Sequence, residues 1–561
     1  MKAYGQPWVA LVTFLFYFFM ATSYQTPGVY IVEQNAFPNS VVPVATAIPA
    51  FIGFTEKTAS TASQGQQVTM VATQINSLKD YESLFGTGQQ QTFTPTFKNP
   101  LLAAPTVPST TSSSPPFPVV TFHDKSAATG WLLTPDKPTL YLYESVQLFF
   151  QNGGGTCYIV SLGDYTAASS ATAADFIAAL QVLELEPDPT MVLCPDALLL
   201  ALDQYYNVAV QMLTHCGKMQ SRVALLDVYG GNYLQLTNPA PLADAITQFR
   251  TSIGLNYLNY GIAYYPWVNT SLLDATSVDF TFFSETGLTN LKDQLDANGG
   301  IKVPGWPSGT ETDIFTEADN LLKYYTKTTP LGTSTPEELT EAIANLEGSL
   351  RQYFPDYKRL TGAITNYLNT LPVAPAMAGV ITTVDTNIGV WQSPANVSLA
   401  SVISPTISVS DETQKNLNVD AKTGKSINAI RTFTGQGTLV WGARTLAGNS
   451  QDWRYVSVRR TLIMLEQSIK LAARAYVFAP NVANTWTNVK SMITTFLYNI
   501  WRQGGLAGAS PTEAFTVQVG LGVTMTANDI LDGLMKVTVQ VALVRPAEFI
   551  EIAFKQQMQT S

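Results

Sequence analysis

The chain is poor in the residues that catalytic and metal sites use most often. Its 561 residues include only two histidines, His123 and His215, and three cysteines, Cys157, Cys194 and Cys216. Two histidines leave little material for metal binding or general acid–base catalysis, although sites built from carboxylates alone stay open. The cysteines are odd in number and none has C-x-x-C spacing. This excludes a disulfide framework and is typical of small buried thiols in a reducing compartment.

Charge is scarce as well. Charged residues make up 13% of the chain, and 31 cations against 41 acids give a net charge of −10. Without a global basic excess, nucleic acid is not expected as a direct partner. The hydrophobic fraction of 46% excludes a disordered chain and allows a large core, and the length suggests three or four domains.

The common catalytic and nucleotide-binding signatures are missing or incomplete. The motifs H-E-x-x-H, G-x-S-x-G and G-x-G-x-x-G do not occur. Residues 424–426 read Gly-Lys-Ser, like the end of a phosphate-binding loop, but the glycine that should open the loop is Val419. The acidic group at 184–188 flanks a proline and favours a solvated turn over a glycosidase pair. The sequence therefore predicts no enzyme activity, no cofactor and no metal site.

The first residues, MKAYGQPWVALVTFLFYFFMATS, hold an apolar run from Trp8 to Ala21 behind one lysine. At about 14 residues, the run has the size of a signal-peptide core and is short for a membrane span. Met20 begins a plausible start of its own. An upstream extension covering residues 1–19, an export or membrane signal, and a structured segment all stay open. No later apolar run reaches 18 residues, so no stable membrane insertion is expected.

Residues 29–32 and 50–54 are two short strand candidates joined by a Pro-rich segment. A strand on such a leash can pair with another chain, or it can be an ordinary edge strand of the first domain. Residues 95–118, rich in Pro, Ser and Thr, predict a linker or a long extended loop.

The middle of the chain alternates strand and helix patterns, which predicts an α/β layer with a partly parallel sheet. Residues 270–370 predict a separate, mostly helical insertion, with a capping box at 335–338 that opens a helix to about Tyr353. Residues 376–450 are rich in loop and strand patterns. The expected strands are 158–160, 191–194, 224–228 and 257–267, and the expected helices are 140–150, 175–185, 198–216 and 244–253.

The C-terminal part predicts an α+β unit. Two helices with strong periodicity are expected at 456–478 and about 484–502, followed by alternating strands at 515–519, 537–543 and 550–554. Residues 441–505 contain eight cations and two acids, so this stretch has a net charge of +6 and the rest of the chain has a net charge of −16. A basic helical pair on an acidic protein favours a surface for an acidic partner, and a solvated face with internal ion pairs is the alternative.

Several blocks, in order, resemble the sheath proteins of contractile phage tails and related contractile injection systems. They are TPGVYIVEQ, IPAFIGFTEK, LYLYESVQLFFQNGGGTCYIVSLG, GIAYYPWV, GVWQSPANVSL, LNVDAKTGKSINAIRTFTGQGTLVWGARTLAG, WRYVSVRRTLIMLEQSI, FLYNIWRQGGLAGASPTEAF and VALVRPAEFIEIAF. The resemblance covers roughly residues 24–90, 140–270 and 376–561. The apolar residues 1–19 depart from the pattern, which favours the upstream extension.

The resemblance implies an α+β and α/β multidomain fold. An α+β C-terminal sheath domain would be completed by an N-terminal strand, with an inserted α/β middle domain and a mostly helical insertion. The implied parts are the extension 1–19, the N-terminal arm and first strands of the sheath domain at 20–57, the middle domain at 58–268 with a Pro/Ser/Thr-rich insertion at 91–138, the helical outer insertion at 269–375, and the sheath domain with its C-terminal arm at 376–561.

The resemblance also implies a function. Subunits would stack as six-fold rings around an inner tube protein, in a metastable extended state whose contraction drives the tube through a target envelope. Baseplate and terminal cap proteins would be further partners, and assembly would be cytoplasmic, in a phage tail or an injection particle. The alternative is an exported surface-lattice or adhesive protein.

Two groups of residues would carry the implied contacts. Arms exchanged between subunits would contribute strands to the neighbour, and basic residues of the helical pair would contact acidic tube residues. The arm strands would be formed by Val29, Tyr30, Ile31 and Val32 and by Phe549, Ile550, Glu551, Ile552 and Phe554. The tube contacts would be Arg454, Arg459, Arg460 and Lys490.

Overall fold

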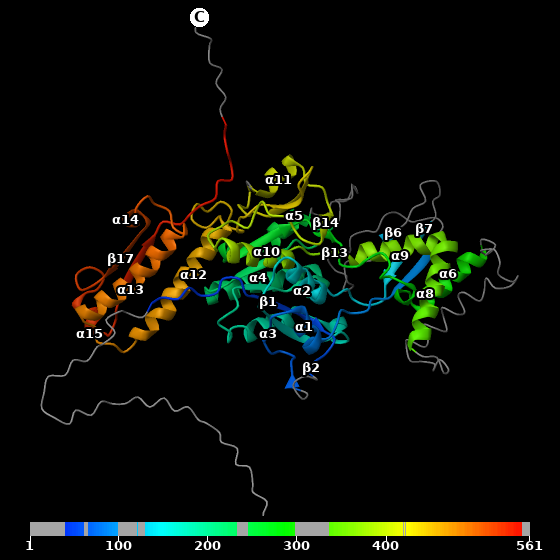
Figure 1. Ribbon diagram of the computed structural model, residues 1–561, viewed down its shortest axis with the longest axis horizontal. Helices are drawn as coiled ribbons and strands as arrows, with labels where there is room; N and C mark the ends of the chain where they lie inside the picture. Colours follow the sequence, from blue (N-terminus) through cyan, green and yellow to red (C-terminus); the bar gives the residue numbers. More distant parts are fainter. Residues whose placement is uncertain are drawn as a thin grey trace, which may run out of the picture.

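The computed structural model describes residues 40–60, 66–98, 120–121, 130–232, 245–297, 336–418, 420 and 422–552. These residues form three parts along one long axis, each with its own apolar core (Figure 1). We call them the central body, the outer unit and the C-terminal unit. The mixed helix and strand architecture with several sheets confirms the predicted mixed fold.

The central body is built on an eight-stranded sheet with the order β16-β15-β11-β10-β9-β1-β8-β4. Neighbouring strands from β15 to β8 are parallel, while β16 and β4 are antiparallel edge strands. The inner strands are buried along their length, as parallel strands usually are. The bounds are β1 (Pro49–Thr55), β4 (Thr73–Ile75), β8 (Cys157–Asp164), β9 (Met191–Leu193), β10 (Val223–Asp227), β11 (Gly261–Tyr265), β15 (Asn428–Phe433) and β16 (Gly437–Trp441).

Two helix pairs pack against this sheet. α2 and α10 contact each other and the strands β1 and β10, and α3 and α4 form a second pair against β8 and β10. These helices and α5 confirm the predicted α/β alternation, apart from α10, for which the sequence predicted no helix. The bounds are α1 (Leu78–Phe85), α2 (Leu142–Gln151), α3 (Ala173–Val182), α4 (Leu202–Met219), α5 (Ala245–Ser252), α10 (Ala374–Asn387) and α11 (Asp411–Asn418).

The outer unit joins two segments that the sequence analysis kept apart. Strands β5 (Phe93–Lys98), β7 (Gly130–Pro135) and β6 (Val120–Thr121) form an antiparallel sheet in the order β5-β7-β6. It shares one core with α6 (Glu285–Ala297), α8 (Pro336–Tyr353) and α9 (Pro355–Leu368), through side chains such as Trp131 and Phe283. The predicted division into a loop insertion at 91–138 and an independent helical insertion at 269–375 is therefore wrong.

The predicted part boundaries differ from the core boundaries in two further places. β1 lies between β9 and β8 in the middle of the large sheet, so residues 50–54 are neither an edge strand nor part of the C-terminal unit. Residues 374–446 supply α10, β15 and β16 to the central body, so its core extends well past residue 376. A smaller sheet, β13-β12-β14, lies where the chain leaves for the outer unit and returns. Its strands are β12 (Val268–Thr270), β13 (Thr370–Leu371) and β14 (Val402–Pro405).

The C-terminal unit confirms the predicted helical pair. α12 (Val456–Ala473) and α13 (Ala483–Arg502) pack with β17 (Phe515–Val519) and β18 (Val537–Val541), flanked by the short helices α14 (Pro511–Ala514) and α15 (Ala527–Leu531). Residues 549–552 are extended but form no strand within the described chain, and Phe554 lies outside it. Among the helices that the structure describes, none has the length and apolar character needed to cross a bilayer.

Candidate functional site

The sheet of the C-terminal unit is the first feature that points to a partner. β17 and β18 pair antiparallel from Phe515 with Val541 to Val519 with Val537, and no third strand joins them among the described residues. The inward side chains pack on α12 and α13, while Thr516 and Gln540 face solvent. A two-stranded sheet leaves one edge of each strand unpaired. Such edges accept a strand from another chain.

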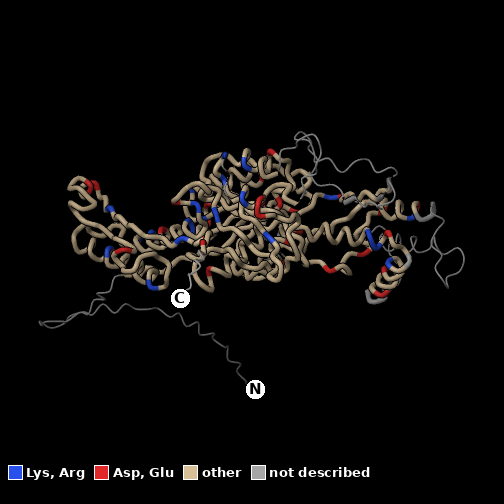
Figure 2. Tube along the Cα trace, turned by 90° about the horizontal axis from the view of Figure 1, so that it is seen from above, with Lys and Arg blue, Asp and Glu red and all other residues tan. Residues whose placement is uncertain are grey.

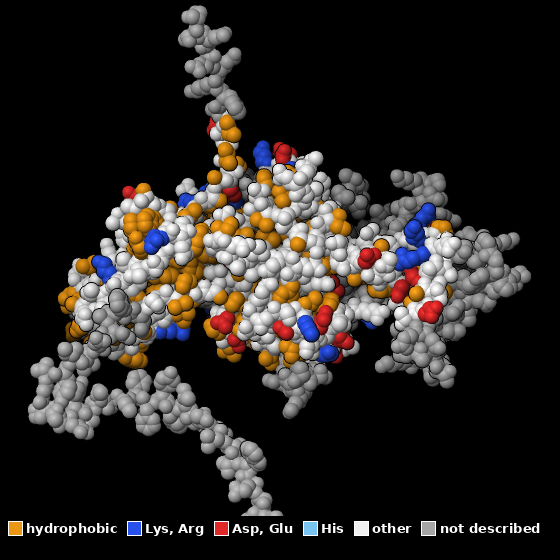
Figure 3. All heavy atoms as spheres, viewed as in Figure 1, with side chains coloured by type: hydrophobic (Ala, Val, Ile, Leu, Met, Phe, Trp, Pro, Cys, Tyr) orange, Lys and Arg blue, Asp and Glu red, His pale blue; other side chains and the backbone are white. Residues whose placement is uncertain are grey.

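The C-terminal segment is the second such feature. Phe549, Ile550 and Ile552 are 78%, 80% and 69% exposed. In Figure 3, apolar side chains follow this segment as it leaves the top of the molecule. Consecutive large apolar side chains left in water are unusual in a monomer and mark an interaction segment.

The root of this segment is fixed by one ion pair. Arg444 is buried, and its Nε donates to both carboxylate oxygens of Glu548, at 2.9 and 3.1 Å, while its Nη2 donates to Oε2. The hydroxyl of Tyr455 donates to the same oxygen at 3.4 Å. The hydrogen bonds with Glu548 raise the pKa of Arg444, because they favour the charged form of the guanidinium.

A second arginine fixes the start of the described chain. Arg460 donates to both oxygens of Asp385, at 2.8 and 2.6 Å, and to the backbone oxygen of Thr46 at 2.7 Å. The Thr46 hydroxyl donates to Asp385 at 2.5 Å, and the Val44 N–H donates to Ser468 at 3.0 Å. Residues 44–46 are thereby tied to α10 and α12 together. The predicted N-terminal arm strand, Val29 to Val32, lies outside the described residues.

The predicted tube-contact residues separate into two groups. Arg459 and Arg460 are 4% exposed; Arg459 stacks on Tyr260 and Trp453, at 4.4 and 4.9 Å from the ring centres, and lies 3.5 Å from Glu466. These two arginines thus offer no surface to another protein in this structure, which corrects the prediction for both. Buried arginine side chains need such partners inside the protein, because an unpaired charge in the interior is strongly unfavourable.

Arg454 is half-buried and donates to the Ser450 backbone oxygen at 3.1 Å, and Lys490 is exposed on α13. Further exposed cations of the same stretch are Lys470, Arg474 and Arg502. Figure 2 shows basic residues where the central body meets the C-terminal unit. The internal ion pairs that the sequence analysis held as an alternative therefore account for part of the +6 charge, and exposed cations account for the rest.

The buried carboxyl groups of the central body have structural partners. Asp227 accepts from the N–H groups of Val373 and Ala374, at 2.8 and 3.0 Å, at the start of α10. Burial raises the pKa of Asp227 to about 7, and these two donors act in the opposite direction. Asp196 likewise accepts from the N–H groups at the start of α2. Both side chains thus hold helix N-termini in place.

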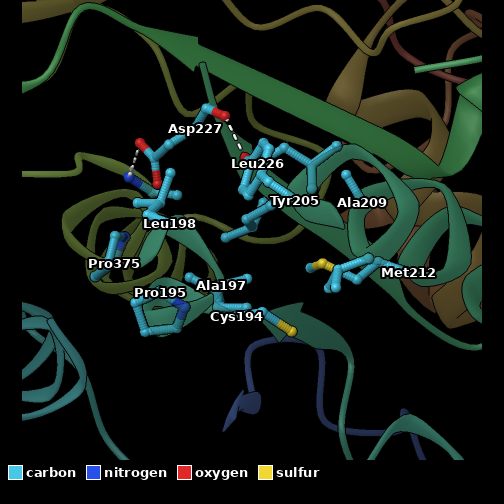
Figure 4. A pocket seen from close by; sticks show the side chains of 14 residues that line it. Cys194, Pro195, Ala197, Leu198, Tyr205, Ala209, Met212, Leu226, Asp227 and Pro375 are labelled. Atoms are coloured by element: carbon cyan, nitrogen blue, oxygen red, sulfur yellow. Dashed lines mark hydrogen bonds between the residues drawn. The ribbon is translucent and has the colours of Figure 1, made fainter. Parts of the chain in front are cut away.

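The pocket beside Asp227 is not a ligand site. It lies between β9, β10 and α4, and Figure 4 shows Cys194, Leu198 and Met212 among its mostly apolar lining. Its volume is about 10 Å3, which is barely room for one water molecule. Within the described ranges, no group of His, Cys, Asp and Glu is arranged to hold a metal ion.

Sequence reasoning missed the two ion pairs that hold the root of the C-terminal segment and the start of the described chain, which we call the N-terminal root. Arg444 and Glu548 are separated by 104 positions, and Arg460 and Asp385 by 75. No spacing rule links such pairs. The only available signal was the excess of cations in a stretch that also predicts buried helices, because buried cations require acidic partners from elsewhere in the chain.

Residues 449–557 match the family described as phage tail sheath C-terminal domain. The match begins just before α12 and includes the C-terminal segment with Glu548 and Ile552. The resemblance to contractile sheath proteins is confirmed. The sheath-like part therefore contains both the two-stranded sheet and the exposed segment beyond it.

A curated relative supports the same resemblance over a limited stretch. The tail sheath protein of Vibrio phage KVP40 is 28% identical over 136 residues, which is 24% of this chain and 20% of that protein. The chain thus matches about a fifth of the relative's length.

Solved structures extend the similarity over nearly the whole chain. The sheath complex of the PVC extracellular contractile injection system, in its contracted state, is 25% identical with a TM-score of 0.56, covering 96% of this chain and 99% of that one. The helical sheath of the anti-feeding prophage, also contracted, is 25% identical with a TM-score of 0.55, covering 95% and 100%. These similarities support a structural sheath subunit.

Proposed function

We propose that this chain is the repeating subunit of a contractile sheath, a structural protein that carries out no chemical reaction. One observation supports the proposal most strongly: the sheath-like unit combines a two-stranded sheet with open edges and an exposed apolar segment beyond a fixed root. A segment that extends away from its own domain next to an incomplete sheet is suited to pairing between copies.

The pairing would work as follows. Residues Phe549 to Phe554 of one subunit, and Val29 to Val32 of another, add strands to the β17–β18 sheet of a neighbour. Each donated strand forms main-chain hydrogen bonds at about 1 kcal/mol net each and buries apolar side chains at about 1.5–3 kcal/mol each. The paired strands would hold neighbouring subunits together while their central bodies rotate.

The stroke would come from the lattice. Subunits assemble as stacked six-fold rings around an inner tube in a metastable extended state, and contraction exchanges one set of contacts for a more stable set. No nucleotide is required for this step. Baseplate and cap proteins would lie at the two ends of the stack of rings. Assembly would take place in the cytoplasm, as part of a phage tail or an injection particle.

We propose that Lys490 and Arg454 contact the inner tube. Lys490→Glu should weaken co-sedimentation of the sheath with its tube, and the parent's binding should fall as salt rises, because exposed charge contacts are screened. Asp411→Lys, an exposed change on the central body, serves as the control. Equal binding by parent and Lys490→Glu across a salt series would place the tube contact elsewhere.

Electron microscopy of the purified full chain tests the proposed function itself. The expected result is hollow tubes with six-fold cross-section, alone or on tubes of the partner protein. A chain that stays monomeric over a wide range of concentration and salt would contradict the proposal. Planar two-dimensional arrays on cell surfaces would favour a surface-lattice protein instead.

A further inference from the structure

Among the described residues, Glu548 is the last whose side chain fixes the C-terminal segment to the rest of the molecule. Ala542 still pairs with Ala507 and Ala514, and Leu543 bridges to Leu506, inside the C-terminal unit. From Phe549 onward the described side chains are exposed. The place where the chain becomes free is therefore set by the contact of Glu548 with Arg444.

Arg444 is itself held by the central sheet. The side chain of Asn428, in β15, accepts from the N–H of Arg444 at 2.7 Å and donates to its carbonyl oxygen at 2.8 Å. The same amide donates to the carbonyl oxygen of Ala263, in β11, at 3.1 Å. Figure 1 shows the C-terminal segment passing from the C-terminal unit toward the central body before it leaves the molecule. The segment follows the β17–β18 sheet in sequence but is anchored to a different sheet.

We propose that Arg444 is a positioning residue, which fixes the point and direction at which the C-terminal strand leaves the subunit and transmits a neighbour's pull to the central sheet. The proposal rests on the proposed function, in which a neighbour receives residues 549–554. The contact between Arg444 and Glu548 is the anchor, and the force would come from the neighbour that binds the donated strand.

The physical reason lies in the burial of Arg444. If Glu548 moved away, a buried guanidinium would lose its counter-ion, which is strongly unfavourable. The Nη1 of Arg444 also donates to the carbonyl oxygen of Asn418 at 3.3 Å, but a neutral carbonyl does not replace a carboxylate.

The anchor also protects the local sheet. Without it, a pull on residues 549–554 would act directly on β18 and separate it from β17 one pair at a time, from Val541 toward Val537. With Glu548 fixed, the pull reaches Arg444 first and is passed through Asn428 to β15 and β11. The acceptor sheet of each subunit is then kept intact while its own arm is under load.

Spin labelling of the full chain in its monomeric form tests the anchor directly. The three native cysteines are buried, so a nitroxide on Ala547→Cys reports on this position alone. The labelled parent, which carries only Ala547→Cys, is expected to show an immobilised component in its spectrum. The control Glu551→Gln removes a carboxylate from the exposed segment and should show the same component. Glu548→Gln should lose most of that component. An unchanged spectrum would overturn the anchor.

A second variant covers the case in which an unpaired Arg444 unfolds the chain. Arg444→Met removes the buried charge together with the contact, and the same loss of the immobilised component is expected in a folded protein. Arg444→Lys keeps the charge without the two-pronged geometry and should restore part of the component. A merely structural role would not produce this graded series.

Assembly separates this proposal from the proposed function. Glu548→Gln keeps residues 549–554, so tubes should still form, with a wider spread of helical twist between subunits than in the parent. An equal spread would overturn the positioning role. If the parent forms no tubes, the proposed function fails, and with it the donated strand, while the spin-label result still decides whether Arg444 fixes the segment.

Discussion

Asp385→Ala is expected to lower the free energy of unfolding by about 3–5 kcal/mol, the range for breaking a buried ion pair from one side. Both side chains of the Asp385–Arg460 pair are 4% exposed. The variant leaves the Arg460 guanidinium buried without a carboxylate and removes the acceptor of the Thr46 hydroxyl. Since typical domains are stable by only about 5–15 kcal/mol, the change is a large fraction of the total.

The chain offers a matched control. Asp411→Ala breaks the pair between Asp411 and Arg431, in which the aspartate side chain is 95% exposed, and should cost at most about 1 kcal/mol. Urea unfolding followed by tryptophan fluorescence and circular dichroism gives both values. A molecule with three cores can unfold in steps, so the first transition is the one to compare. Similar losses in the two variants would show that the Asp385–Arg460 pair adds nothing through its burial.

The double variant Asp385→Leu with Arg460→Met adds a second check. It removes both charges and should cost clearly less than the sum of the single variants, because no unpaired charge is left in the interior. Additive losses would mean that the two residues act separately. The N-terminal root would then be held by the Val44 and Ser468 contact rather than by the ion pair.

Local sequence signals were sufficient wherever one element decided its own structure. The capping box at 335–338 and the following pattern predicted α8 to its last residue, Tyr353. The periodic apolar face of 456–478 predicted α12, although the helix ends earlier, at Ala473. These elements carry start signals or one apolar face, and neither depends on distant residues.

Local sequence signals failed where contacts with distant segments determine the secondary structure. α10 is missed because it is buried on nearly all sides, so its small apolar residues give no clear face. The strand β5 contains Pro95, which argues against a strand in general. It is tolerated here because β5 is an edge strand, with β7 as its one neighbouring strand in the described sheet.

The candidate site shows the same division. The exposed segment could be predicted from its alternating apolar residues and its place near the chain end. The ion pairs at the two roots could not be predicted. In the sequence, nothing marks Arg444 and Arg460 as buried and Lys490 as exposed. Only the position of Glu548 and Asp385 in space separates a buried anchor from a surface charge.

Removing residues 549–561 is expected to abolish tube formation while leaving a folded, soluble chain. The three exposed apolar side chains of this segment are not part of any described core, so their loss should not change stability. A donated strand with about five hydrogen bonds and three buried apolar side chains contributes roughly 10 kcal/mol before association costs. Losing even about 4 kcal/mol per join lowers affinity about a thousandfold.

Single variants sharpen this test. Ile550→Lys should reduce assembly strongly, because a charge would have to be buried against the neighbour's sheet. Leu255→Lys, on the central body, changes a residue of nearly equal exposure, 79% against 80%, and should leave assembly close to normal. Sedimentation velocity and electron microscopy measure both.

Deleting residues 20–34 should give the same monomeric state from the other end of the chain, because the N-terminal strand is the second donated segment. Normal tube yield after either deletion would show that the arm in question is not exchanged. Since Arg444 and Arg460 fix the two roots independently, loss of one arm should leave the other root intact. The two deletions therefore test the two joins separately.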